Sequence, residues 1–256
     1  MESSLKSMKT RSIVKGEKPL VCIPIVGKSN ADILKELANI LDKKPDIIEW
    51  RADFYNGLTN RKQLFQLLSF IREKVEGIPI LFTVRSEKEG GHPNHLTERG
   101  KVSLLAALCS RGLVDMIDYE LQNDLFSIHY LRQVSLKYNV PMVLSYHNFH
   151  ETPSREVLVE LCLKMDRLDA DFVKVAVMPN QMEDVLELLN AMSDVRKTIN
   201  ANLIAISMGS YGAITRLFGW IFGSAMTFGI GEQSSAPGQI PVEDVRKVIE
   251  LTAKYM

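Results

Sequence analysis

The chain alternates short apolar runs with longer segments in which apolar residues recur at helical spacing. The short runs are rich in Ile, Val and Leu, and near-continuous runs of this kind are typical of parallel strands covered on both faces. Eight strands separated by helix-length segments indicate a parallel α/β fold. The predicted strands are Leu20–Val26, Asp46–Arg51, Pro79–Arg85, Val114–Glu120, Val140–His147, Phe172–Met178, Asn202–Met208 and Ala225–Ile230.

Helical features are clearest in three of the intervening segments. Thr152 and Pro153 are expected to start one helix, as its N-cap and first helical residue. Asn180 and Glu183 resemble the capping box of a second helix. The third segment has apolar residues at a helical period: Val102, Leu105, Leu108 and Cys109.

The number and order of these elements favour a single (β/α)8 barrel, the TIM-barrel fold, over an open sheet. The chain has 256 residues, and barrels of this class typically have about 250. No GxGxxG motif follows the first strand, which speaks against a dinucleotide-binding sheet. We therefore expect one barrel domain over residues 1–256, with residues 1–18 forming an extension that packs outside the strands.

Composition argues against several classes of partner. Basic and acidic residues each number 31, so the formal net charge is zero, and neither a nucleic acid nor an anionic membrane is an expected partner. The longest uncharged run, Leu217–Gly231, is shorter than the about 20 residues needed to span a bilayer. Residues 1–18 carry charges throughout and are not a signal peptide. A cytoplasmic protein is expected, and a reducing compartment also suits three widely spaced cysteines: Cys22, Cys109 and Cys162.

Lys174 is the most informative polar residue, because it lies in the middle of the sixth predicted strand. Strand alternation directs Val173 and Val175 toward the helices, and Lys174 and Ala176 into the barrel. Burial there disfavours an isolated ammonium and favours a nucleophilic amine. The alternative is a structural lysine that reaches solvent or pairs with a carboxylate.

His147 ends the fifth predicted strand, and neighbouring strands lie about 4.8 Å apart. It could therefore share a substrate with Lys174 and transfer protons near neutral pH, although a hydrogen-bonded core histidine is the alternative. Two histidine pairs raise the possibility of a metal, His147 with His150 and His92 with His95. Neither pair has the spacing and third ligand of a zinc site, so no metal is expected.

Polar residues also follow other strands, and in a (β/α)8 barrel the active site lies at the carboxyl ends of the strands. Three arginines fall there and together could hold an anionic, hydroxylated substrate, although each alone is more often a surface residue: Arg51, Arg85 and Arg216. Glycines around the eighth strand could instead cradle a phosphate, or serve tight loops: Gly223, Gly229 and Gly231.

The segment Gly231–Gln239 follows the eighth strand and is predicted to be a lid over the site. Its small residues can approach a ligand closely, and Gly231 and Gly238 can absorb backbone rotation at its two ends. Pro237 limits the open conformations that the segment must give up on closing. Its alternative role is a plain surface turn.

Several motifs occur in the order and spacing of a known family. They are Glu49-Trp50-Arg51, Ser145-Tyr146-His147, Lys174–Pro179, Phe222–Ala225 and Ser235–Gln239. On these motifs the chain, from about Leu20 to its last helix, resembles the type I 3-dehydroquinate dehydratases.

The resemblance implies dehydration of 3-dehydroquinate to 3-dehydroshikimate in the shikimate pathway of aromatic amino-acid biosynthesis, without a metal or an organic cofactor. It implies that Lys174 forms an imine (Schiff base) with the substrate ketone, that His147 is the general base and later the acid, and that Glu89 orients His147. It implies substrate-binding roles for six further residues: Glu49, Arg51, Arg85, Arg216, Ser235 and Gln239. Members of the family are commonly dimers, so a homodimer is expected.

Two positions depart from the family's pattern. Asn148 follows His147 where an aspartate is usual, and Trp220 stands where an acidic residue is expected, but neither change removes a catalytic group. Two other hypotheses stay open: another class I Schiff-base lyase or aldolase on the same fold, and a non-catalytic barrel that binds the metabolite. The sequence leaves undecided whether the product serves biosynthesis or comes from quinate breakdown.

Overall fold

The computed structural model describes residues 18–256, so the predicted extension over residues 1–18 lies outside the described residues except for Lys18. The strands are β1 (Leu20–Ile25), β2 (Ile47–Arg51), β3 (Ile80–Thr83), β4 (Met116–Glu120), β5 (Met142–Asn148), β6 (Phe172–Val177), β7 (Asn202–Ser207) and β8 (Met226–Phe228). The α-helices are α2 (Asn30–Leu41), α3 (Arg61–Lys74), α4 (Glu98–Ser110), α5 (Leu125–Tyr138), α6 (Arg155–Arg167), α7 (Met182–Val195), α8 (Ala213–Phe218) and α9 (Val242–Ala253). Short 3₁₀ helices follow β2 and β3 and precede β8: η1 (Ala52–Phe54), η2 (Glu87–Glu89) and η3 (Gly219–Phe222).

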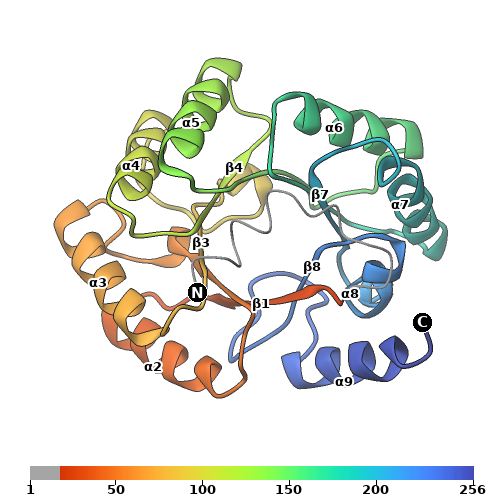
Figure 1. The fold of residues 1–256 in the computed structure, drawn as a ribbon, viewed down its shortest axis with the longest axis horizontal. Coiled ribbons are helices and arrows are strands. Elements are labelled where there is room, and N and C mark those ends of the chain that lie inside the picture. Colours follow the sequence, from red (N-terminus) through yellow and green to blue (C-terminus); the bar gives the residue numbers. More distant parts are fainter. Residues whose placement is uncertain (1–17) are drawn as a thin grey trace.

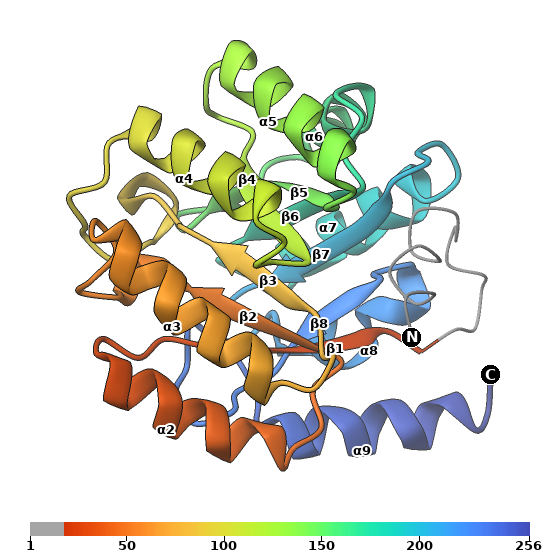
Figure 2. The ribbon, with the colours of Figure 1, turned by 60° about the vertical axis from the view of Figure 1, so that its left-hand side comes forward.

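The strands form one parallel sheet in the order β7-β6-β5-β4-β3-β2-β1-β8. The sheet curls until its two edges meet, where the backbone N–H of Ala225, just before β8, donates to the carbonyl of Leu203 in β7 (2.7 Å). The helices form a ring outside the strands in chain order (Figure 1), and Figure 2 shows them against the outer face of the sheet. This architecture confirms the predicted (β/α)8 barrel.

Side chains alternate between the two faces of the curled sheet as the apolar pattern predicts. Val173, Val175 and Val177 of β6 belong to the large apolar core between strands and helices. Phe172 and Ala176 of the same strand belong to a smaller core inside the barrel. Apolar side chains therefore fill the barrel interior, and the polar groups lie nearer the carboxyl ends of the strands.

Several element ends differ from the prediction by one or two residues. β8 is shorter than the predicted Ala225–Ile230, because Ile230 forms only an isolated bridge with Pro241 after β8 has ended. Thr152 is not the N-cap of α6; its hydroxyl donates to the carbonyl of Met178 (3.0 Å), and Ser154 is the cap. The predicted capping box of α7 is displaced by one residue, with Gln181 as the cap and Asp184 in place of Glu183.

No helix within residues 18–256 is long and apolar enough to cross a membrane. The three cysteines are all buried and none forms a disulfide.

Candidate active site

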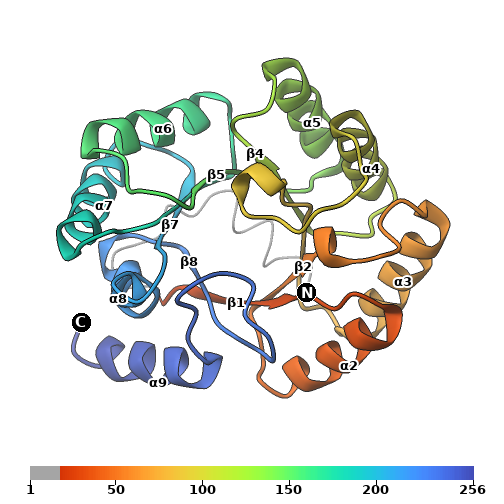
Figure 3. The same ribbon diagram turned by 180° about the vertical axis from the view of Figure 1, so that it is seen from behind.

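The nine predicted site residues line one small cavity at the carboxyl ends of the strands. They reach it from β2, the segment after β3 with η2, β5, β6, α8 and the loop after β8. Figure 3 shows η2 and the loop after β8 at the near end of the barrel. The cavity has a volume of about 40 Å³, which holds only a few water molecules. Any ligand larger than a few water molecules therefore needs the loop or its neighbouring side chains to move before it can enter.

Lys174 projects from β6 into this cavity and is 5% exposed. Its Nζ lies 3.9 Å from Oδ2 of Asp118 and 4.0 Å from Oε1 of Glu49. It also lies 4.4 Å from the centroid of the Phe228 ring, over the ring face. A cationic group at this point is attracted by two carboxylates and by the ring quadrupole. The sequence predicted the burial of Lys174 correctly, but it did not reveal these partners.

Arg85 contacts Asp118, one of the two carboxylates beside Lys174, and two further side chains of the cavity wall. Its guanidinium lies 2.8 Å from Oδ1 of Asp118 and 3.3 Å from Oε1 of Glu120, and it donates to the hydroxyl of Ser145 (2.7 Å). Ser145 also donates to Oδ1 of Asp118 (2.8 Å). The positive charge of Arg85 in the cavity wall is therefore already balanced by buried acids, and it is not free to bind an anionic ligand.

His147 contacts Glu89 twice, through its backbone N–H (3.1 Å) and through ring Nδ1 (2.8 Å), both to Oε2. Burial, together with the nearby positive charges of Arg85, Lys174 and Arg51, lowers the pKa of His147 well below its usual value. Burial raises the pKa of Glu89 to about 8, against the opposing effect of Arg85. The pair therefore favours a neutral imidazole, and the protonation of Glu89 decides which ring nitrogen carries hydrogen.

Arg51 and Arg216 differ in how their charge is balanced. Arg51 forms a bidentate pair with Asp53 (2.9 Å for both bonds). Arg216 is 2% exposed, makes no ion pair within residues 18–256, and has a buried Nε without a partner. Burial without a carboxylate lowers the pKa of Arg216 to about 10. An unpaired, buried guanidinium is a ready site for a substrate carboxylate.

The loop after β8 is held over the cavity by these two arginines. Arg51 donates to the carbonyl of Ser235 (3.2 Å), and Arg216 donates to that of Pro237 (2.9 Å). Within the loop, the Gln239 amide accepts from the Ser235 backbone (2.8 Å) and donates to its hydroxyl (3.0 Å). The loop therefore lies over the cavity, with Ser235 and Gln239 in the cavity wall.

Glu49 completes the wall from β2, where its Oε1 accepts from the hydroxyl of Thr83 (2.9 Å). Asp118 and Glu120 were missed at the sequence level. A signal for them existed, since two acids two residues apart on a predicted strand must share a face, as Glu49 and Arg51 do on theirs.

Two alternative interpretations of the site, a metal centre and a phosphate cradle, can be compared with the described structure. Residues 18–256 contain no group of three or more His, Cys, Asp or Glu side chains that could hold a metal. The glycines around β8 face protein side chains: a Cβ would meet Val242 at Gly229 (3.0 Å) and Ile40 at Gly231 (2.4 Å). Their small size is explained by this close packing.

The two departures from the family's pattern leave His147 in place. Oδ1 of Asn148 accepts from the backbone N–H groups of His150 (2.9 Å) and Glu151 (3.1 Å), a turn that an aspartate oxygen would form equally well. Trp220 is buried in the outer apolar core, away from the cavity.

Fold and site together define a (β/α)8-barrel enzyme with a buried lysine beside a histidine–glutamate pair. A model of the type I 3-dehydroquinase family matches residues 21–256. A 3-dehydroquinate dehydratase of Geobacillus sp. (strain WCH70) is 49% identical over 94% of this chain and 93% of its own. The chain therefore belongs to the type I 3-dehydroquinase family and is a carbon–oxygen hydro-lyase.

Solved structures agree with this assignment. The crystal structure of 3-dehydroquinate dehydratase from Geobacillus kaustophilus HTA426 has a TM-score of 0.91 at 43% identity, covering 93% of this chain and 92% of that one. A type I 3-dehydroquinate dehydratase from Clostridium difficile, solved with covalently modified comenic acid, has a TM-score of 0.90 at 39% identity, covering 95% and 96%.

Proposed function

We propose that this chain converts 3-dehydroquinate to 3-dehydroshikimate through a covalent imine on Lys174, in the shikimate pathway. The observation that carries the proposal is the position of Lys174, buried and between two carboxylates in the same cavity as His147. A protonated imine needs compensating negative charge, and Asp118 and Glu49 supply it without reorganisation. The related C. difficile structure, with its covalently modified ligand, supports covalent chemistry in this family.

The reaction can be written from the groups in the cavity. The Lys174 amine adds to the substrate ketone and water leaves, which gives a protonated imine. His147 removes a proton from the adjacent carbon, and the electron pair is held as an enamine. Loss of the β-hydroxyl, protonated by His147, releases water and forms the double bond. Hydrolysis of the imine then frees the product and restores the amine.

The remaining residues have assignable roles in this proposal. Glu89 orients His147 through Nδ1, so that Nε2 faces the substrate. Arg216, the unpaired cation of the site, binds the substrate carboxylate, with Ser235 and Gln239 beside it. The substrate hydroxyls are bound by three other residues that line the cavity: Glu49, Arg51 and Arg85.

No step of this reaction requires a metal or an organic cofactor. We further propose that the enzyme acts in the cytoplasm as a homodimer. Buried, unpaired cysteines suit a reducing compartment.

Borohydride trapping tests the imine directly. Incubation with 3-dehydroquinate and borohydride should add one reduced adduct, and peptide mapping should assign it to Lys174. Lys174→Ala should abolish both adduct and turnover, whereas Lys164→Ala, at an exposed lysine of α6, should leave both intact. An adduct at Lys101, the other buried lysine near the site, would overturn the assignment.

The same experiment separates the two alternative functions. Trapping with an aldolase substrate, but not with 3-dehydroquinate, would indicate another Schiff-base barrel enzyme. Binding of 3-dehydroquinate without an adduct or product would indicate a metabolite-binding barrel.

A further inference from the structure

Asp53 is a buried acid to which the proposed reaction assigns no role. It lies on η1, directly after β2, and is 1% exposed. Its two oxygens accept four hydrogen bonds: two from the Arg51 guanidinium (2.9 Å each), one from the backbone N–H of Arg85 (3.2 Å) and one from that of His92 (2.9 Å). Although burial opposes ionisation, the Arg51 hydrogen bonds hold the pKa of Asp53 below its usual value, so a carboxylate makes all four contacts.

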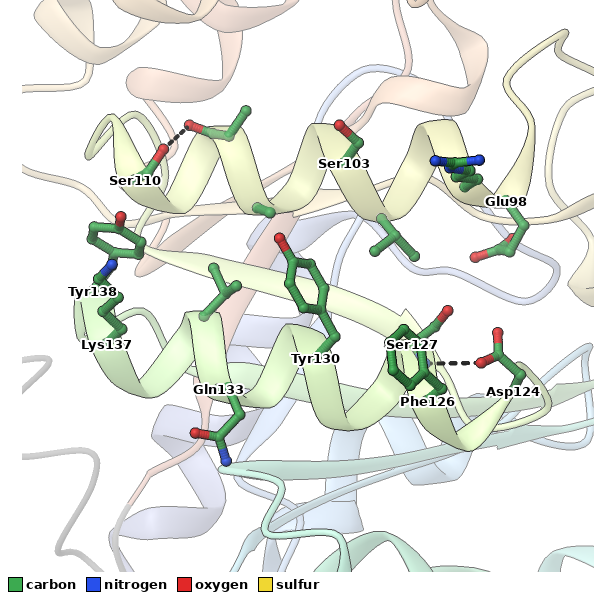
Figure 4. Close-up of a pocket in the computed structure, with 15 residues that line it drawn as sticks. Glu98, Ser103, Ser110, Asp124, Phe126, Ser127, Tyr130, Gln133, Lys137 and Tyr138 are labelled. Carbon is green, nitrogen blue, oxygen red and sulfur yellow. Dashed lines mark hydrogen bonds between the residues drawn. The ribbon is translucent and has the colours of Figure 1, made fainter.

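The backbone contacts of Asp53 are long-range, unlike the local hydrogen bond of an aspartate that caps a helix. Figure 4 shows such a local bond, in which Asp124 accepts from the backbone N–H of Ser127 at the start of α5 (2.8 Å). Asp53 instead accepts from residues 32 and 39 positions further along the chain. It therefore fastens a separate segment of the chain to the end of β2.

The fastened segment, residues 85–92, is the one that carries Glu89, and we call it the Glu89 segment. Asp53 holds its first and last residues through one carboxylate, so the two ends of the segment are fixed to each other and to the end of β2. Between these ends, Oε2 of Glu89 lies 2.8 Å from Nδ1 of His147. The place of Glu89 beside His147 therefore depends on how the two ends of its segment are held.

The same carboxylate also orients Arg51, to which the proposed reaction gives a substrate hydroxyl. Two parallel N–H···O bonds fix the plane of its guanidinium. The guanidinium carbon lies 5.1 Å from the centroid of the Phe54 ring, and that ring lies 5.2 Å from the ring of His92. Ring contacts thus join the same two residues, Arg51 and His92, that Asp53 joins by hydrogen bonds.

We propose that Asp53 is a positioning residue of the reaction, which holds Glu89 against His147. It does so while it also fixes Arg51 in the cavity wall. The inference rests on the proposed role of Glu89 as the partner of the general base. Ionised Glu89 accepts the Nδ1–H of His147 and leaves Nε2 free to remove a proton from the substrate. Without Asp53 the ends of the Glu89 segment separate, and this hydrogen bond is lost.

Asp53→Asn tests the proposal, because the amide keeps the size of the side chain but loses its charge and one acceptor. Turnover should fall by about 100-fold, which is the cost of misplacing a group of the reaction by about 1 Å. The fall of kcat/KM toward low pH should also shift to lower pH. The reason is that burial, which raises the pKa of Glu89 to about 8, is relieved when its segment opens.

Asp115→Asn is the matched control. Asp115 also forms a bidentate pair with an arginine, Arg72 (2.6 Å for both bonds), and accepts a backbone N–H, that of Ile80 (2.9 Å). These contacts lie at the amino end of β3, away from the cavity. The control should therefore lose similar hydrogen bonds and keep both the turnover and the pH profile of the wild type.

Nitrogen NMR of the imidazole measures the positioning of Glu89 without any substrate. Above the pKa of Glu89, His147 of the wild type and of Asp115→Asn should carry its hydrogen on Nδ1, and Asp53→Asn should lose this preference. Gly91→Ala gives a second route if Asp53→Asn does not fold. A Cβ there would lie 2.1 Å from the carbonyl oxygen of Arg85, so it opens the Glu89 segment without removing a charge and should have the same effect.

The outcomes separate this inference from the imine chemistry. An Nδ1 preference and a pH profile that survive Asp53→Asn, or an Nδ1 preference that survives Gly91→Ala, would overturn the positioning role of Asp53. A wild-type protein that traps no borohydride adduct would overturn the imine reaction, whereas the imidazole measurement, made without substrate, would still decide the role of Asp53.

Discussion

At the scale of residues, the site depends on buried charges that neutralise one another. The sequence left open whether Lys174 stands alone or pairs with a carboxylate, and it lies between carboxylates from β2 and β4. Which strand a residue occupies can be predicted from a local pattern. Which side chains meet across the barrel depends on register, and here register aligns Ser145 with Lys174 and Glu120 with Ser145.

Ionised Glu89 is expected to lower the free energy of unfolding while it serves catalysis. Burial raises its pKa to about 8, whereas a glutamate in the unfolded chain has a pKa of about 4.3. Between these values the unfolded chain releases a proton that the folded chain keeps, so stability falls as pH rises from about 4.3 to about 8. Glu89→Gln removes this effect and should raise the free energy of unfolding at pH 8 by on the order of 2 kcal/mol.

The measurement is denaturant unfolding of both proteins at pH 5 and pH 8. The stability gain of Glu89→Gln should be small at pH 5 and larger at pH 8, while turnover falls at both. A gain that is equal at the two pH values would show that Glu89 does not titrate in this range.

At the scale of elements, the apolar runs located every strand, because a parallel barrel strand is covered on both faces. Helix starts were predicted less well. The Thr152 hydroxyl bonds to a carbonyl from the loop after β6, and the carboxylate of Asp184, not Glu183, accepts from the Asn180 backbone (2.7 Å). Several residues near each helix start can serve as a cap, and tertiary contacts decide among them.

The loop after β8 should depend on Gly238 for closure. Gly238 has φ +72°, and a Cβ there would lie 2.1 Å from the carbonyl oxygen of Gly209. Gly238→Ala should therefore prevent the loop from lying against Gly209, after β7, and against Arg216, and should lower kcat/KM by about 10-fold or more. Gly77→Ala is the control, because Gly77 has φ +91° but nothing within 4 Å.

Hydrogen exchange with and without the borohydride-trapped adduct measures whether the loop after β8 becomes ordered over the site. The segment Gly231–Gln239 should gain protection in the adduct of the wild-type and Gly77→Ala proteins, and gain less in Gly238→Ala. Equal exchange with and without the adduct would mean that the segment is a plain surface turn.

At the scale of the whole molecule, a chain of ion pairs connects the surface between α4 and α5 to the Glu89–His147 pair. Lys101 lies 3.3 Å from Glu98 at this surface and 3.1 Å from Glu120. Glu120 lies 3.3 Å from Arg85, whose guanidinium is 3.6 Å from Glu89. The sequence could not reveal this connection, because its members come from the segment after β3, from η2, from α4 and from β4. Lys101 alone resembles any surface lysine of a helix.

This connection predicts that a charge outside the cavity sets the pH dependence of turnover. With Glu89 ionised, Nδ1–H of His147 donates to it and Nε2 is free to accept a proton; with Glu89 protonated, Nε2 carries hydrogen and cannot act as the base. Activity should therefore fall as pH falls through the pKa of Glu89. Negative charge on Glu120 already raises that pKa.

Lys101→Met removes the cation that balances Glu120, so the pKa of Glu89 should rise and the acid limb of kcat/KM should move to higher pH. Lys101→Arg keeps the charge and should keep the limb in place. Arg132→Met is the control for stability, because Arg132 is equally buried and pairs with Asp171 (2.6 Å) at the amino end of β6. Both methionine variants should lose about 3 kcal/mol of stability, but only Lys101→Met should move the acid limb. An unmoved limb would show that the charge of Lys101 does not reach the Glu89–His147 pair.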